Sequence, residues 1–144
     1  GVNLEPEALA WFEVETDLVV EQVGFVTDDS DLLGASPDGV IKCYDGDKFP
    51  YIPLELKCPK PSTHLSYLME QCLPKEHIAQ VHFQMALCES PYAYFASYNP
   101  NVRPLILKVM WNEYTDLMVK SLEKYKEEYR AALITIDGED NAED

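Results

Sequence analysis

Two short stretches decide the fold that we expect for this chain: residues 36–39 read Ser-Pro-Asp-Gly and residues 54–58 read Leu-Glu-Leu-Lys-Cys. Proline and glycine around Asp38 are typical of a kink in a strand, whereas the alternation in the second stretch is typical of a strand interior. Residues two positions apart in a strand share a face, so Glu55 and Lys57 point the same way, and Asp38 on a neighbouring strand can join them. Two carboxylates and one ammonium at one point suit a Mg²⁺-bound water that attacks phosphorus.

Length and composition indicate a single folded domain. The chain has 144 residues, of which 47% are hydrophobic, so it can bury a core, and we expect one domain over residues 1–136. There is no run of about 18 apolar residues and no basic segment followed by an apolar stretch, so we expect a cytoplasmic protein without a membrane span. The four cysteines lie 15, 14 and 16 positions apart, which is not a zinc-binding spacing and predicts reduced thiols.

The net charge of −15 argues against a surface that coats nucleic acid, because such surfaces are normally basic. Residues 137–144 hold five acids and no base, and we expect this tail to be disordered. If the protein acts on DNA, the remaining acidity requires a narrow DNA path or basic residues supplied from elsewhere. An acidic surface that keeps the domain soluble is the ordinary alternative.

The hydrophobic pattern predicts an α/β fold in which a small mixed sheet is flanked by helices. In the first helix Pro6 lies in the first turn, where its missing N–H is not needed. The strand over 33–43 is interrupted at 36–39 and forms a hairpin with the strand over 51–58. Helices are predicted for residues 4–15, 75–89 and 112–133, and strands for residues 18–27, 33–43, 51–58, 93–98 and 105–111.

Each half of the proposed site has an ordinary explanation when it is taken alone. Any half-buried sheet produces a stretch such as Leu-Glu-Leu-Lys-Cys, and Ser-Pro-Asp-Gly makes a good turn. Their combination with a preceding helix that carries Glu5 and a later helix that presents Gln80 favours catalysis. A binding module that keeps the fold without turnover, acting as an assembly or DNA-end-binding subunit, is the alternative from another class.

Pro37-Asp38 followed by Glu55-Leu56-Lys57 matches the PD-(D/E)XK nuclease signature, which implies a restriction-endonuclease-like core. More narrowly, the chain resembles the phage lambda exonuclease and YqaJ-type viral recombinase family. The resemblance rests on residues 4–8, 34–40, 54–59, 79–81 and 93–100, which read Leu-Glu-Pro-Glu-Ala, Gly-Ala-Ser-Pro-Asp-Gly-Val, Leu-Glu-Leu-Lys-Cys-Pro, Ala-Gln-Val and Ala-Tyr-Phe-Ala-Ser-Tyr-Asn-Pro.

This resemblance implies a Mg²⁺-dependent alkaline exonuclease, with Mn²⁺ as a substitute ion, that digests one strand of duplex DNA from its 5′ end. The 3′ overhang would serve recombination with a single-strand annealing protein. The family also implies a ring-shaped homotrimer that threads DNA through its centre, so that the outer surface is free to be acidic. It implies a phage or prophage protein in the bacterial cytoplasm, or one of the host nucleus for a eukaryotic virus.

By the same resemblance, Asp38 and Glu55 would be the principal metal ligands, joined by the backbone carbonyl of Leu56. Lys57 would orient or deprotonate the attacking water and stabilise the developing phosphate charge. Glu5 would complete the metal shell. Its ordinary role would be to complement the helix dipole, and Glu7 could compete for the same position.

Gln80 matches a glutamine that helps to position the attacking water or the scissile phosphate, although it could also be part of a solvated helix face. His77 is a weaker candidate, since a lone helix histidine is more often structural. Lys60, Arg103 and Lys108 are candidates for phosphate contacts, with a solubilising role as the alternative.

Two further expectations concern related enzymes. The family carries an N-terminal segment with basic residues and a 5′-phosphate pocket, and the chain begins almost at the Glu5 helix, so end recognition is not predicted from these residues. Within the nucleases, a Cas4-like or restriction-type enzyme is the nearest rival. A Cas4-like enzyme needs four cysteines around an iron–sulfur cluster, which the wide spacing does not favour.

Overall fold

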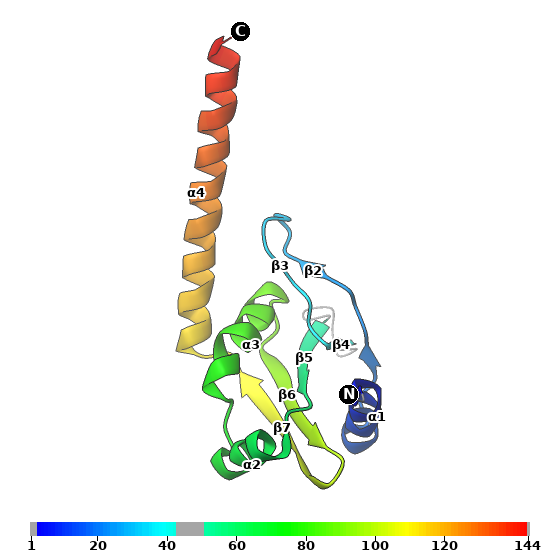
Figure 1. The fold of residues 1–144 in the computed structure, drawn as a ribbon. Helices are drawn as coiled ribbons and strands as arrows, with labels where there is room; N and C mark the ends of the chain where they lie inside the picture. Colours follow the sequence, from blue (N-terminus) through cyan, green and yellow to red (C-terminus); the bar gives the residue numbers. More distant parts are fainter. Residues whose placement is uncertain (1–2, 43–50, 144) are drawn as a thin grey trace.

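The protein folds around a five-stranded mixed sheet with helices on both faces (Figure 1). The computed structural model describes residues 3–42 and 51–143, and the side chains as far as residue 138. Its helices are α1 (Glu5–Thr16), α2 (Pro61–Glu70), α3 (Lys75–Leu87) and α4 (Glu113–Glu143). Its strands are β1 (Val20–Glu21), β2 (Val26–Thr27), β3 (Gly34–Ala35), β4 (Gly39–Lys42), β5 (Tyr51–Lys57), β6 (Tyr92–Asn99) and β7 (Val102–Met110).

The sheet has the strand order β1-β4-β5-β6-β7, and β2 and β3 pair separately. Strands β4 and β5 form the expected antiparallel pair, with Gly39 opposite Leu54. Strands β5 and β6 are parallel, and the chain between them forms α2 and α3, as a parallel crossover requires. Strands β6 and β7 are antiparallel, as predicted. The predicted small mixed sheet flanked by helices is therefore confirmed.

The two faces of the sheet are covered by different helices. On one face α1 contributes Ala8 and Phe12 to a cluster with Leu54 and Leu56 of β5. On the other face, residues of α2 and α3 pack against β6 and β7; this cluster contains Tyr67, Val81, Met85, Ala93, Phe95 and Leu105. Because side chains alternate along a strand, Glu55 between Leu54 and Leu56 faces the side of α2 and α3.

Several predicted boundaries were wrong. The strand predicted over 18–27 is divided into β1 and β2 by the segment around Gly24. No helix was predicted between the strand over 51–58 and the helix over 75–89, so α2 was missed; its Pro61 lies at the first helical position, where proline is favoured. Helix α4 continues to Glu143, beyond the predicted end at residue 133. The connection between the predicted strands over 33–43 and 51–58 lies outside the described residues, and the division into residues 1–136 and a tail stays a prediction.

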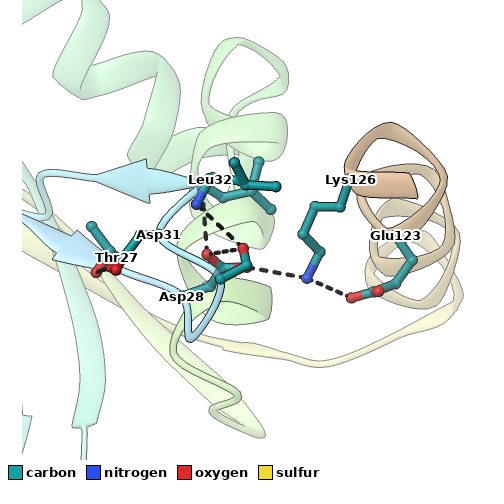
Figure 2. A network of polar contacts seen from close by, with 8 residues as sticks. Thr27, Asp28, Asp31, Leu32, Glu123 and Lys126 are labelled. Carbon is teal, nitrogen blue, oxygen red and sulfur yellow. Dashed lines mark hydrogen bonds and ion pairs between the residues drawn. The ribbon is translucent and has the colours of Figure 1, made fainter. Parts of the chain in front are cut away.

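Helix α4 extends beyond the rest of the fold (Figure 1), and residues in its first half contact the other elements. His82 Nδ1 of α3 lies 2.7 Å from Thr115 Oγ1 of α4. Lys126 Nζ lies 3.1 Å from Asp28 Oδ2 in the loop between β2 and β3, and 2.7 Å from Glu123 Oε1 (Figure 2). These contacts join α4 to α3 and to the β2–β3 hairpin. In the described part of the chain, no helix has the length and apolar character needed to cross a membrane.

Candidate active site

Strand β5 brings a buried carboxylate and an ammonium group together. Glu55 is only 3% exposed, and its Oε1 lies 2.8 Å from Lys57 Nζ. The contact follows from their two-residue spacing, which places both side chains on one face of the strand. A buried carboxylate without donors is strongly unfavourable, so the contact with the Lys57 ammonium offsets part of the cost of burying Glu55.

The second motif meets the first at the junction of β4 and β5. Asp38 immediately precedes β4, and its Oδ2 accepts a hydrogen bond of 2.7 Å from the backbone N–H of Leu56. The antiparallel register of β4 and β5 explains this contact between residues that are 18 positions apart. The structure thus brings the Asp38 side chain to the backbone of the residue that lies between Glu55 and Lys57.

The pKa of Asp38 shows that several acids lie around this junction. Burial is the main reason why its pKa rises from 3.8 to about 6, and repulsion from Glu55 and Glu5 adds to the rise. The Leu56 N–H and the charge of Lys57 act in the opposite direction. Three carboxyl groups and one ammonium group therefore share one electrostatic environment, and a divalent cation would relieve the repulsion among the acids.

Helix α1 presents Glu5 to this environment. Glu5 lines a cavity of about 250 Å³ together with Leu56 and Cys58 of the β5 region, and with Asn3 and Leu4. Glu7, the competing candidate, accepts a 2.7 Å hydrogen bond from the hydroxyl of Tyr98 instead. The structure therefore favours Glu5 over Glu7 as the helix acid beside the two strands.

Helix α3 contributes a glutamine to which the sequence had assigned no role. Gln84 is 3% exposed, and its Nε2 donates a 3.0 Å hydrogen bond to Glu55 Oε2. Gln80 lies one helical turn earlier, so it points from the same side of α3, and it is exposed. The signal that could have identified Gln84 was its four-residue spacing from Gln80 on a polar helix face.

His77 also lies near the site. Burial lowers its pKa, and the charge of Lys57 lowers it further. Its Nε2 lies 3.3 Å from the hydroxyl of Tyr67, and its ring centroid lies 5.4 Å from that of Phe95. These contacts give His77 a packing role at the edge of the site.

The residues predicted to contact phosphates lie just before α2 and on β7. Lys60 is exposed just before α2, and Arg103 is exposed on β7. The backbone carbonyl oxygen of Arg103 lies 2.8 Å from His64 Nε2. Lys108 lies with its Nζ 4.0 Å from the ring centroid of Tyr92, a cation–π contact that ties it to the sheet. Their contact with DNA stays a prediction.

The donor set fits a hard cation that keeps much of its water. Among the side chains of residues 3–42 and 51–138, no three His, Cys, Asp or Glu groups are placed so as to hold a metal ion. Mg²⁺ is commonly bound by one or two carboxylates together with water, and the carboxylates of Asp38 and Glu55 lie near enough to each other to interact electrostatically. The residues present therefore suit Mg²⁺, but not a closed site made entirely of side chains.

The fold matches that of an alkaline exonuclease. It matches the crystal structure of the alkaline exonuclease LHK-Exo from Laribacter hongkongensis with a TM-score of 0.71 and 25% sequence identity, covering 94% of this chain and 70% of that one. It matches the structure of LHK-Exo in complex with dAMP with the same TM-score and identity, covering 94% of this chain and 69% of that one. These matches confirm the predicted fold class.

Within this class, the sequence matches the YqaJ-like viral recombinase domain over residues 1–91. The chain belongs to this family, and the resemblance drawn from its motifs is confirmed. No curated protein matches the chain. The protein is thus an alkaline-exonuclease-like member of the viral recombinase family.

Proposed function

We propose that this protein is a Mg²⁺-dependent exonuclease that degrades one strand of duplex DNA from its 5′ end and leaves 3′ single-stranded overhangs for recombination by strand annealing. The observation that carries the proposal is the 2.7 Å hydrogen bond from Leu56 N–H to Asp38 Oδ2, next to the 2.8 Å contact between Glu55 and Lys57. It joins the two halves of the nuclease signature at one place in the fold.

Asp38 and Glu55 would hold the ion, with Glu5 beside them. The backbone carbonyl of Leu56 would be a further ligand, because the N–H and C=O of a strand residue point to the same side, and the Leu56 N–H points to Asp38. When bound, Mg²⁺ would polarise the phosphate and lower the pKa of a bound water. Mn²⁺ has the same preference for oxygen ligands and is expected to substitute.

Lys57 is placed to act on the attacking water and on the phosphate. Its side chain is 30% exposed, so the ammonium reaches the solvent side of the site while it remains 2.8 Å from Glu55. There the ammonium orients the water and stabilises the negative charge that develops on the phosphate oxygens; to deprotonate the water, Lys57 would first have to lose its own proton. Gln80, exposed on α3, would help to position the water or the scissile phosphate.

The substrate that we propose is the end of double-stranded DNA. LHK-Exo has been crystallised with dAMP, a product-sized nucleotide. Lys60, Arg103 and Lys108 would contact phosphates. A homotrimeric ring would confine those contacts to its inner wall and leave its outer surface free to be acidic, which is compatible with the net charge of −15. A single-strand annealing protein would receive the overhang, in the bacterial cytoplasm or a host nucleus.

The Cas4-like alternative gains no support from the cysteines. Cys58, Cys72 and Cys88 are free, and in the described part of the chain they take part in no cluster that could hold a metal. Cys43 lies outside the described residues.

The test is digestion of a blunt duplex labelled at either end, with and without a 5′ phosphate, in Mg²⁺ or in EDTA. We expect Mg²⁺-dependent loss of nucleotides from the 5′ end, and no digestion by Glu55→Gln. DNA-end binding without digestion in Mg²⁺ or Mn²⁺ would instead indicate the non-catalytic binding module. Calorimetric titration with Mg²⁺ also distinguishes the exonuclease from the binding module. A catalytic centre should bind the ion with measurable heat, and Asp38→Ala should abolish that heat.

A further inference from the structure

A buried amide on α3 holds the carboxylate of Glu55. We infer that Gln84 is a positioning residue for the metal centre: it fixes the orientation of the Glu55 carboxylate and thereby sets the affinity for Mg²⁺. This inference rests on the proposed function and adds a residue to it.

The contact has a defined polarity. An ionised carboxylate only accepts hydrogen bonds, so the amide nitrogen of Gln84 must face Glu55 Oε2, at 3.0 Å. The other carboxylate oxygen, Oε1, lies 2.8 Å from Lys57 Nζ. Each oxygen of Glu55 thus has its own donor, one from β5 and one from α3, and together they fix the plane of the carboxylate.

This arrangement leaves acceptor positions of Glu55 available to a metal ion. The two oxygens of a carboxylate offer about four acceptor positions, and the two donors take one at each oxygen. A lone pair on either oxygen therefore remains for a cation. Without Gln84, Glu55 would lose a donor at a buried position and would be free to turn away, which raises the free energy of the ion-binding arrangement.

Gln84 itself is held rigidly. It is 3% exposed, and its neighbours Val81 and Met85 are fully buried against the sheet. The same helix carries Gln80 one turn earlier. Helix α3 thus couples the orientation of a metal ligand to the placement of the predicted water-contacting residue, as a supporting residue on a rigid element does.

The experiment compares Gln84→Met with His82→Met. Methionine keeps approximately the length of glutamine but has no N–H donor. His82 is the matched control, because it lies on the same helix, is also 3% exposed and makes one short side-chain hydrogen bond, to Thr115, away from the site. Each variant loses one buried hydrogen bond of α3, but only Gln84→Met loses the contact with Glu55.

The readouts are the Kd for Mg²⁺ by calorimetry and the Mg²⁺ concentration that half-saturates DNA digestion. We expect both to rise about 10- to 100-fold in Gln84→Met, whereas His82→Met leaves them at the wild-type values. Digestion by Gln84→Met should recover at high Mg²⁺. Gln84→Asn keeps the amide but has a side chain shorter by one methylene group, so it should raise both Mg²⁺ concentrations less than Gln84→Met does. It replaces Gln84→Met in the experiment if that variant does not fold.

The outcomes separate the two proposals. If the wild-type protein neither binds Mg²⁺ nor digests DNA, the proposed function and this inference both fail. If the wild-type protein does both and Gln84→Met matches His82→Met in its Mg²⁺ affinity, the nuclease stands and the positioning role of Gln84 is refuted.

Discussion

Neutralising Asp38 should stabilise the metal-free protein while it removes the activity. The pKa of Asp38 rises from 3.8 to about 6 on folding because the group is partly buried and is repelled by Glu55 and Glu5. A carboxyl group whose pKa is raised in the folded state favours folding when it is protonated, and this contribution is lost as the pH rises from about 4 through about 6. Above that window the charged carboxylate opposes folding. Asp38→Asn removes this charge and keeps an oxygen that can accept the Leu56 N–H.

The expected gain in stability of Asp38→Asn follows from the pKa shift of Asp38. About two pKa units correspond to about 3 kcal/mol when fully expressed. Asp38 is only partly buried, and solvent screening reduces the effect to about 1 kcal/mol. For a domain of this size that free energy corresponds to a rise in Tm of about 2–4 °C.

The assay is thermal unfolding in EDTA at pH 8 and at pH 4, followed by circular dichroism. We expect Asp38→Asn to have the higher Tm at pH 8, and the difference to disappear at pH 4, where wild-type Asp38 is protonated. With Mg²⁺ at pH 8 the order should reverse, because only the wild-type protein binds the ion and is stabilised by it. Asp29→Asn, at an exposed position, is the control and should leave Tm unchanged.

Two results would refute this reasoning. One is a lower Tm for Asp38→Asn than for the wild-type protein at pH 8 in EDTA. The other is a difference in Tm that is the same at pH 8 and pH 4, which would show that the charge of Asp38 is not its cause.

Four further predictions follow from the same contacts. Lys57→Ala removes one donor from Glu55, as Gln84→Met does, but it also removes a positive charge that repels the cation. These two effects oppose each other, so the calorimetric Kd for Mg²⁺ should stay nearly unchanged while the rate of digestion falls about 10²- to 10⁴-fold; loss of both together would make Lys57 structural. Glu5→Gln should weaken Mg²⁺ binding about tenfold, whereas Glu7→Gln, which disturbs only the contact with Tyr98, should not; equal effects would contradict the assignment of Glu5. His64→Ala should lower the free energy of unfolding by about 2–3 kcal/mol, measured with urea, because His64 is fully buried between Ser97 Oγ and the Arg103 carbonyl; a neutral result would show that these groups find other partners. Sedimentation should show a closed oligomer, and a clean monomer would count against the ring.

Local sequence was sufficient to predict the hairpin that carries the site. The alternation over 54–58 and the kink at 36–39 are properties of neighbouring residues, and they predict β4, β5 and the shared face of Glu55 and Lys57. The contact between Asp38 and Leu56 follows once the register is known. Helix α2 was missed because Pro61 is compatible with both the end of a strand and the start of a helix, and no local signal separates the two.

The sequence by itself determined which chemistry is available: two carboxylates and a lysine, with the spacing that brings them to one edge of a hairpin. The tertiary structure decided which other side chains support them. Gln84 reaches Glu55 only because the parallel pairing of β5 and β6 places α3 across that face of the sheet, and Glu5 is favoured over Glu7 only because of how α1 packs on the opposite face. Such contacts join residues far apart in the chain, so they depend on how the elements pack and not on any pattern within one element.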